Sequence, residues 1–229
     1  QFFFPGTHHV GHDGNAGTWP IDEKGVDLSY YKNVNSGGDK SYHVMGTHTN
    51  WFGGYWHDRK FGFGHWAPYS DAPGKKLWIW SRAREGAIWE DLLTDKDGQY
   101  IEAQSGVTFN QAAERSGFHS PFNQKSLGPF YSETKTEYWF PVKAAGGMVD
   151  ASPYGTLNVE ARGDSMKIII NPISAIQDSI KVTVSGQIIY QSALQLKPME
   201  LYVKTIALTG TGRKNIRVTV GNDRHVYSS

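Results

Sequence analysis

The chain has 229 residues, of which 38% are hydrophobic and 26 are glycine. This composition is typical of a turn-rich globular protein rather than a helical bundle. The formal charge of +1 gives no basic surface for nucleic acid, and no apolar run approaches the roughly 18 residues of a membrane-spanning helix. Cysteine is absent, which excludes disulfides, Cys-ligated metals and thiol nucleophiles.

The first residues, Gln1-Phe-Phe-Phe-Pro5, form a pattern typical of the middle of an extended strand. They include neither an initiator methionine nor the charged and cleavable regions of a signal peptide. We therefore expect that polypeptide upstream of Gln1 has been removed.

Aromatic residues and histidines are concentrated in one part of the chain. All eight tryptophans and eight of the nine histidines lie between His8 and Trp139. Such a mixture suits a surface that binds a hydroxyl-covered ligand such as a sugar, because rings stack on C–H faces and polar groups bind hydroxyls. A large aromatic core with hydrogen-bonded histidines is the alternative, since most tryptophans are structural.

A cluster of potential metal ligands, His8, His9, His12 and Asp13, occurs near the start of the chain. Histidines with this spacing do not share one face of a strand, and the neighbouring glycines disfavour a helix. We therefore expect loop histidines that bind a ligand or the backbone, and no metal site. No phosphate-binding loop, dinucleotide fingerprint or nucleophile elbow occurs, so we expect no cofactor.

The aromatic density is highest in residues 51–66. Within this stretch we expect Trp56 to stack on a sugar ring and His65 to contact the ligand. Sugar-processing sites normally need two groups, one that gives a proton and one that takes it. His57 and Asp58 are candidates for one of these roles.

Residues 76–82 predict a strand that carries binding groups on one face. Because side chains alternate along a strand, Leu77 and Ile79 point one way. Trp78, Trp80 and Arg82 point the other way, and two indoles with a guanidinium suit a binding platform. Residues 83–93 predict one short helical turn.

Residues 99–106 predict a second strand of this kind. Tyr100, Glu102 and Gln104 share the face opposite to Ile101 and Ala103. Glu is uncommon in strands, and a carboxylate beside Tyr and Gln suits a polyol ligand, with Glu102 as acid or base. The alternative is an ordinary solvated strand face.

The residue composition of the sequence changes near residues 146–150. Before it, residues 110–128 predict a long loop and residues 136–142 a strand. After it, about six strands follow at roughly 8–12-residue spacing, with clean alternation in residues 180–184 and 216–220. We expect a domain over residues 1–148 and a small β-sandwich accessory region over residues 149–229, in which no residue pattern points to catalysis.

Three stretches together resemble a known family. They are Phe52-Gly-Gly-Tyr-Trp-His-Asp-Arg-Lys-Phe-Gly-Phe-Gly-His-Trp-Ala67, Pro73-Gly-Lys-Lys-Leu-Trp-Ile-Trp80 and Ile88-Trp-Glu-Asp-Leu-Leu-Thr-Asp-Lys-Asp-Gly-Gln-Tyr-Ile-Glu-Ala-Gln-Ser-Gly106. They are similar, in order and spacing, to an uncharacterised bacterial domain family that often occurs beside tetratricopeptide repeats. That family is grouped with the galactose-mutarotase-like β-supersandwiches. The resemblance covers roughly residues 1–160.

This resemblance implies an all-β fold, an antiparallel β-supersandwich part followed by the small β-sandwich. Its concave face would hold the sugar, and Glu102 matches the strand-borne carboxylate that acts as the base in related mutarotase-like proteins. Family members carry a further N-terminal half that supplies part of the sheet and of the site. We therefore expect the missing N-terminal half of the domain as a partner, besides a saccharide ligand.

The leading hypothesis is a carbohydrate-active domain, a glycoside hydrolase or a sugar epimerase, in which Glu102 is the acid/base. The substrate-binding candidates are Trp56, His65, Trp78, Trp80, Arg82, Tyr100 and Gln104, and the other catalytic candidates are His57 and Asp58. A non-catalytic carbohydrate-binding module and a structural domain of a larger multidomain protein are the alternatives. We expect no nucleic acid partner and no membrane span, and a secreted or cell-envelope setting would fit a glycan ligand.

Overall fold

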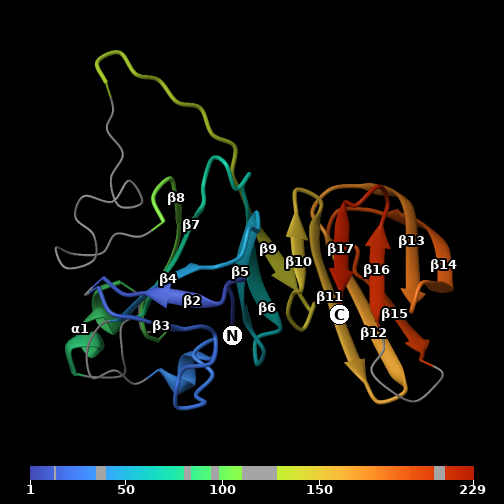
Figure 1. Ribbon diagram of the computed structural model, residues 1–229, viewed down its shortest axis with the longest axis horizontal. Helices are drawn as coiled ribbons and strands as arrows, with labels where there is room; N and C mark the ends of the chain where they lie inside the picture. The colour runs from blue at the N-terminus through green and yellow to red at the C-terminus, as the bar shows by residue number, and fades with distance from the viewer. Residues whose placement is uncertain (13, 35–39, 80–83, 94–97, 110–127, 209–214) are drawn as a thin grey trace. The chain divides into compact units, whose positions relative to one another are not determined.

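The computed structural model describes residues 1–12, 14–34, 40–79, 84–93, 98–109, 128–208 and 215–229. These residues form antiparallel sheets almost throughout (Figure 1). The predicted all-β fold is therefore confirmed. The chain divides into two compact units. Unit 1 contains Gln1, Trp51–Trp66 and Tyr138–Ser229, and unit 2 contains Phe2–Asn50 and Ala67–Glu137.

Unit 2 is built around a five-stranded antiparallel sheet with the order β3-β2-β4-β7-β8. Its strands are β2 (His8–Val10), β3 (Ala16–Thr18), β4 (Lys40–Met45), β7 (Gly74–Ile79) and β8 (Ile101–Gly106). The unit also contains β1 (Phe2–Phe3), the 3-10 helix η1 (Tyr31–Asn33) and the helix α1 (Arg84–Leu92). The helical turn predicted over residues 83–93 is thus a nine-residue helix.

One face of this sheet buries apolar side chains of its strands β4 and β7. Leu77 and Ile79 of β7 lie opposite Tyr42 and Lys40 of β4, and both apolar side chains are at most 1% exposed. The predicted orientation of Leu77 and Ile79 is confirmed. Trp19 contacts Tyr42 and donates its indole N–H to the carbonyl of Phe4. The burial of this face leaves the other face of the sheet to carry polar groups.

In unit 1, three neighbouring antiparallel strands have an unusual glycine pattern. They are β5 (Trp51–Trp56), β6 (Phe61–Trp66) and β9 (Tyr138–Lys143). A Cβ atom at Gly54 would lie 2.7 Å from the ring of Phe63 on the next strand, and one at Gly64 would collide with the ring of Phe140. The glycines are therefore required because rings from adjacent strands lie over their backbone.

The C-terminal part of unit 1 is a β-sandwich of two four-stranded sheets (Figure 1). One sheet has the order β10-β11-β12-β15, with β10 (Asp150–Ser152), β11 (Gly155–Arg162), β12 (Ser165–Pro172) and β15 (Tyr202–Ala207). The other has the order β14-β13-β16-β17, with β13 (Ile176–Val184), β14 (Gln187–Leu196), β16 (Ile216–Val220) and β17 (His225–Ser228). Their inward aliphatic side chains form one core.

The alternation in the sequence predicted this sandwich correctly. Ile180 and Val182 are fully buried whereas Lys181 between them is exposed. Ser185 and Gly186 have φ angles of 50° and 84° in the turn between β13 and β14, as a tight two-residue hairpin turn requires. The short strands β10 and β17 were not predicted. The domain boundary expected at residue 148 stays a prediction, and β10 begins at Asp150.

A buried polar chain joins these two unpredicted strands. His225 Nδ1 lies 3.0 Å from Asp150 Oδ2, and His225 Nε2 lies 3.3 Å from Ser152 Oγ. Because the carboxylate only accepts, Nδ1 carries the proton and the Ser152 hydroxyl donates to Nε2. The connectivity is that of a Ser–His–Asp triad. Ser152 Oγ already accepts a hydrogen bond from the N–H of Tyr154, and His225 is 0% exposed. We therefore interpret these three hydrogen-bonded residues as a structural link between the two strands.

Replacing His225 with alanine is expected to destabilise the protein by about 2–4 kcal/mol, because Asp150 and Ser152 would lose a buried partner and a cavity would form. Urea unfolding monitored by circular dichroism measures this loss. Lys167→Ala, at an exposed position of β12, is the control and should change stability by less than about 0.5 kcal/mol. An unchanged unfolding midpoint for His225→Ala would contradict the structural role.

Candidate functional site

The second face of the unit 2 sheet carries a compact set of polar and aromatic side chains, which we call the polar face. It consists of Ser41 and His43 from β4, Lys76 and Trp78 from β7, and Glu102 and Gln104 from β8. The register places them in two rows across the sheet, Ser41–Trp78–Glu102 and His43–Lys76–Gln104. Residues two apart on a strand share a face, so the pairing of three strands gathers the six side chains.

Trp78 lies at the centre of the polar face, between two histidines. Its ring centroid is 5.1 Å from that of His12 and 5.6 Å from that of His43. The backbone N–H of His12 donates to Ser41 Oγ at 2.6 Å, which fixes the chain after β2 beside β4. Two imidazoles and the hydroxyl of Ser41 thus lie around the indole of Trp78.

The carboxylate of Glu102 lies directly across from Trp78 and is held by two neighbours. Gln104 Nε2 donates to Glu102 Oε2 at 2.8 Å. Burial raises the pKa of the Tyr100 phenol, and the charge of Glu102 and a hydrogen bond to it raise this pKa further. The Tyr100 hydroxyl therefore stays protonated as a donor to Glu102. The carboxylate is oriented, yet part of it remains accessible on a half-buried strand.

His43 is a fully buried imidazole in the middle of β4. Burial lowers its pKa to about 4, and the charges of Lys76, His12 and His9 add to this effect. His43 is therefore neutral at pH 7, when it combines one N–H donor with one acceptor nitrogen. A neutral imidazole can thus both donate a hydrogen bond and accept one.

The predicted site residues fall into three groups in the structure. Trp78, Tyr100, Glu102 and Gln104 lie together in unit 2, with Trp78 and Glu102 directly opposite each other. Trp80 and Arg82 lie outside the described residues. Trp56, His57, Asp58 and His65 belong to unit 1.

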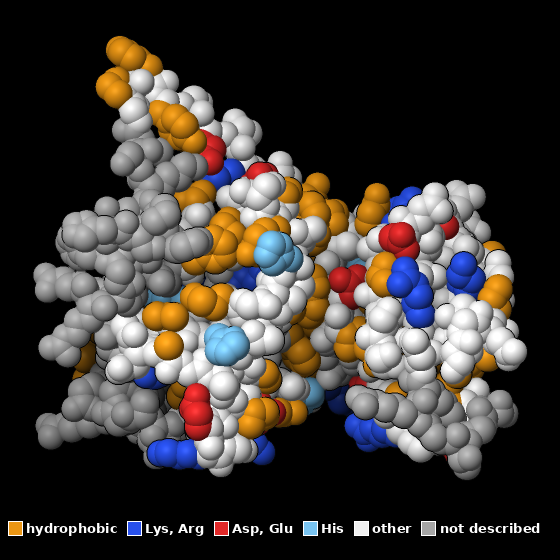
Figure 2. All heavy atoms as spheres, viewed as in Figure 1, with side chains coloured by type: hydrophobic (Ala, Val, Ile, Leu, Met, Phe, Trp, Pro, Cys, Tyr) orange, Lys and Arg blue, Asp and Glu red, His pale blue; other side chains and the backbone are white. Residues whose placement is uncertain are grey.

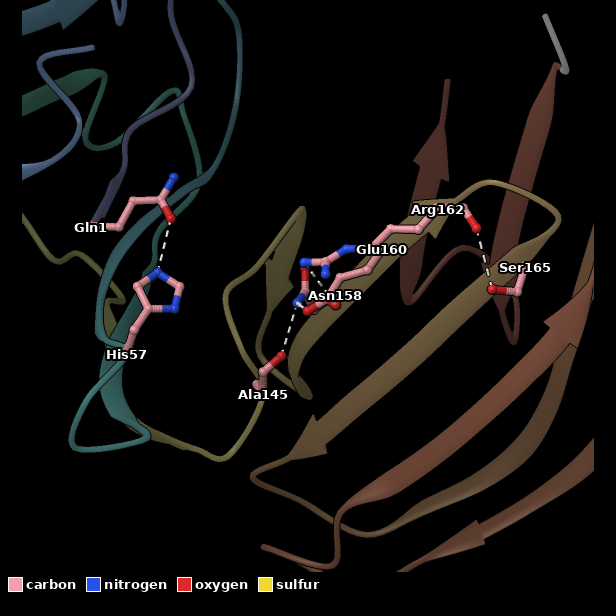
Figure 3. A network of polar contacts seen from close by, with 7 residues as sticks. All are labelled: Gln1, His57, Ala145, Asn158, Glu160, Arg162 and Ser165. Carbon is pink, nitrogen blue, oxygen red and sulfur yellow. Dashed lines mark hydrogen bonds and ion pairs between the residues drawn. The ribbon is translucent and has the colours of Figure 1, made fainter. Parts of the chain in front are cut away.

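The unit 1 candidates surround the strands β5, β6 and β9. His57 Nε2 lies 3.0 Å from Gln1 Oε1 (Figure 3), and burial together with the N-terminal ammonium lowers the pKa of His57. Asp58 follows in the exposed turn between β5 and β6. His65 is 2% exposed because it stacks on Phe52 at 4.2 Å and contacts Trp139.

Several large aromatic side chains of these strands are exposed. Trp56 is 43% exposed and Trp139 is 50% exposed, and both rings contact Phe63. The rings of Phe63 and Trp139 are inclined by only 27° at 6.1 Å. Figure 2 shows hydrophobic side chains and histidines at the surface of the molecule. The exposed rings of Trp56 and Trp139, together with the half-buried ring of Phe63, form what we call the unit 1 aromatic face.

A second hydrogen-bonding arrangement in Figure 3 is structural. Asn158 Nδ2 donates to the carbonyl of Ala145 at 2.8 Å and to Glu160 Oε1 at 3.3 Å. Asn158 is buried in the sandwich unit, so these bonds hold the chain between β9 and β10 against β11.

Three residues of the polar face were not among the predicted site residues. Ser41 and His43 lie in β4, and Lys76 lies in β7 within the strand that was predicted from its tryptophans. The alternation in Lys40-Ser-Tyr-His-Val-Met45 puts Ser41 and His43 on one face. That signal was present, but it does not show which strand β4 pairs with.

The early histidines have different neighbours in the structure, and Asp13 lies outside the described residues. His9 is buried against Tyr42 at 4.8 Å, His8 is exposed beside Thr7, and His12 faces Trp78. Among the described residues no three His, Asp or Glu side chains gather as potential ligands. His12 instead contributes to the polar face.

Residues 1–142 match the family described as Domain of unknown function (DUF5107). The chain belongs to this family. The match includes every strand of the polar face. The chain is also similar to a solved structure, a TPR-domain containing protein from Parabacteroides distasonis, with 25% identity and a TM-score of 0.41. That similarity covers 66% of this chain and 23% of the other. No helix among the described residues is long and apolar enough to cross a membrane.

The pKa of His43 predicts a specific acid sensitivity. The unfolded chain takes up a proton on this histidine near pH 6.5, whereas the folded protein resists protonation until about pH 4. The unfolded state therefore binds more protons between these values, and stability falls as the pH falls from 6.5 to 4. The loss is on the order of 3 kcal/mol.

His43→Gln should lack this part of the acid destabilisation, because glutamine does not titrate. Urea unfolding of the wild type and the variant at pH 7 and pH 4 measures the difference. His8→Gln, at an exposed position of β2, should behave as the wild type. Equal acid losses in the wild type and His43→Gln would show that His43 is not the group responsible.

Proposed function

We propose that this domain is carbohydrate-active and binds a saccharide on the polar face of unit 2. The observation that supports this most directly is the placement of Trp78 opposite Glu102, with Gln104 bonded to the carboxylate. An indole provides a surface for the C–H face of a sugar ring. A carboxylate one strand away provides a hydrogen-bond acceptor and a proton-transfer group for the same ring.

The chemistry that follows from this arrangement is acid–base catalysis at a sugar. Glu102 would take or give a proton, and Tyr100 and Gln104 would orient its carboxylate. The second proton-transfer group would come from the histidines that flank Trp78. His12 suits this role better than His43, because His12 is exposed whereas His43 is buried and held neutral.

The assignment of the fold to the galactose-mutarotase-like supersandwiches is part of the same proposal. It rests on the sequence resemblance and is compatible with the antiparallel sheets. Under this proposal the reaction would be glycoside hydrolysis or epimerisation at the anomeric carbon. Both reactions use proton-transfer groups within reach of the sugar ring, a role that the carboxylate of Glu102 would fill.

Glu102→Gln tests the catalytic part of the proposal. The substitution keeps size and hydrogen bonding but removes the titrating group, so turnover should fall by about 10²–10⁴-fold while saccharide binding remains. A panel of glycans, with products analysed by mass spectrometry and binding measured by calorimetry, provides both quantities. Glu90→Gln in α1, away from the polar face, is the matched control. Undiminished turnover in Glu102→Gln would remove Glu102 from the mechanism.

A non-catalytic glycan-binding function is the second candidate, and the unit 1 aromatic face favours it. Trp56 and Trp139 offer exposed rings, with the half-buried Phe63 between them, as stacking on a sugar requires.

On this alternative, Trp139→Ala should weaken glycan binding about fivefold, since one stacked ring contributes on the order of 1 kcal/mol. Quenching of tryptophan fluorescence by glycans measures the binding. Tyr131→Ala, an exposed aromatic outside the strands, is the control. Retained binding in Trp139→Ala together with lost binding in Trp78→Ala would instead favour the polar face.

A further inference from the structure

Lys76 is the side chain of the polar face that the proposed chemistry does not use. It lies at the centre of the sheet, between His43 on β4 and Gln104 on β8. Its residue is only 2% exposed, which is rare for lysine. None of the described residues accepts a hydrogen bond from its ammonium group.

The neighbouring Lys75 has polar and aromatic contacts that Lys76 lacks among the described residues. Lys75 points to the opposite face, where its Nζ donates to Thr49 Oγ1 and lies 5.6 Å over the ring of Tyr69. Lys76 has neither kind of partner among the described residues. The two adjacent lysines thus differ in their contacts, although burial lowers the pKa of both and that of Lys75 to about 8.

The Lys76 side chain passes close to two glycines of the same face. A Cβ atom at Gly106 would lie 3.2 Å from Lys76 Nζ, and one at Gly74 would lie 3.1 Å from Lys76 Cε. The lysine therefore extends over bare backbone, with its nitrogen above Gly106 on β8. The Lys76 ammonium therefore lies on the same face of the sheet as Glu102, but near Gly106 at the far end of β8.

The charge of Lys76 is energetically unfavourable without a partner. Burying an ammonium group away from water costs several kcal/mol unless an anion or hydrogen-bond acceptors compensate it. Burial lowers the pKa of Lys76 accordingly. The nearest titratable neighbour across the sheet is His43, which is another base and offers no negative charge.

A second donor on the polar face also has no acceptor. The indole N–H of Trp78 is buried and has no hydrogen-bond partner among the described residues. One oxygen of the only carboxylate in the two rows, Glu102, already accepts from Gln104. Two donors of the polar face, the Lys76 ammonium and the Trp78 indole, therefore have no acceptor among the described residues.

We propose that Lys76 is an anion-binding position and that the ligand of the polar face is an acidic saccharide, which carries a carboxylate or a phosphate ester. This inference rests on the proposed function and specifies its substrate class. The anionic group pairs with Lys76 above Gly106, while the sugar ring lies toward Trp78 and Glu102. Both carboxylate and phosphate oxygens suit the point charge of a lysine.

Calorimetry with matched ligand pairs tests the inference on the full chain. The pairs are glucuronate with glucose, galacturonate with galactose, and glucose 6-phosphate with glucose. The acidic member of at least one pair should bind about tenfold more tightly or better, as expected for a charge-assisted hydrogen bond in a buried site. The phosphate pair and the uronate pairs distinguish the two kinds of anionic group.

Lys76→Met should reduce the affinity for the acidic ligand to that for its neutral partner. Lys40→Met, on the opposite face of the same sheet, is the matched control and should keep the preference. Thermal unfolding monitored by circular dichroism verifies that both variants fold. If Lys76→Met does not fold, the matched ligand pairs measured on the wild type still test whether the protein prefers acidic saccharides.

The outcomes separate this inference from the proposed function. Equal affinity for acidic and neutral members overturns the inference and leaves saccharide binding intact. A preference for acidic ligands that survives in folded Lys76→Met also overturns it. If no saccharide of either charge binds, the proposed function fails and the inference fails with it.

Discussion

The antiparallel pairing of β4, β7 and β8 is the constraint on which the candidate site depends. Each strand alone presents two or three unremarkable side chains on alternate positions. Their register aligns Ser41 with Trp78 and Glu102, and His43 with Lys76 and Gln104. Because a shift by one residue would turn every side chain to the other face, the burial of Leu77 and Ile79 on the apolar face also fixes the polar face.

The charged and polar groups on the polar face are not all compensated by described neighbours. The face carries a carboxylate held by Gln104, an imidazole whose pKa is lowered to about 4, and an ammonium group to which no described residue is hydrogen-bonded. A sheet face with only a structural role normally pairs its buried charges. Incomplete compensation at one place is the arrangement that binding sites have, since a ligand then provides the missing interactions.

In unit 1, aromatic residues, histidines and glycines pack in a different way from those of unit 2. There the aromatic rings lie over glycines of adjacent strands, and His65 stacks between Phe52 and Trp139. The dense aromatic segment at residues 51–66 is thus divided between a buried histidine and exposed rings such as Trp56. Residue composition does not separate these two roles, because burial depends on what packs across the sheet.

The sequence by itself determined the all-β fold, the sandwich strands and the side-chain alternation in β7 and β8. These properties are local, since a period of two residues and turn residues specify strands without reference to partners. It did not identify β10 and β17, which are short and depend on the link from Asp150 through His225 to Ser152. Only the tertiary structure placed Glu102 opposite Trp78, added Ser41, His43 and Lys76, and assigned His57, Asp58 and His65 to another unit. Strand partners are far apart along the chain, and their choice depends on burial and register across the whole sheet.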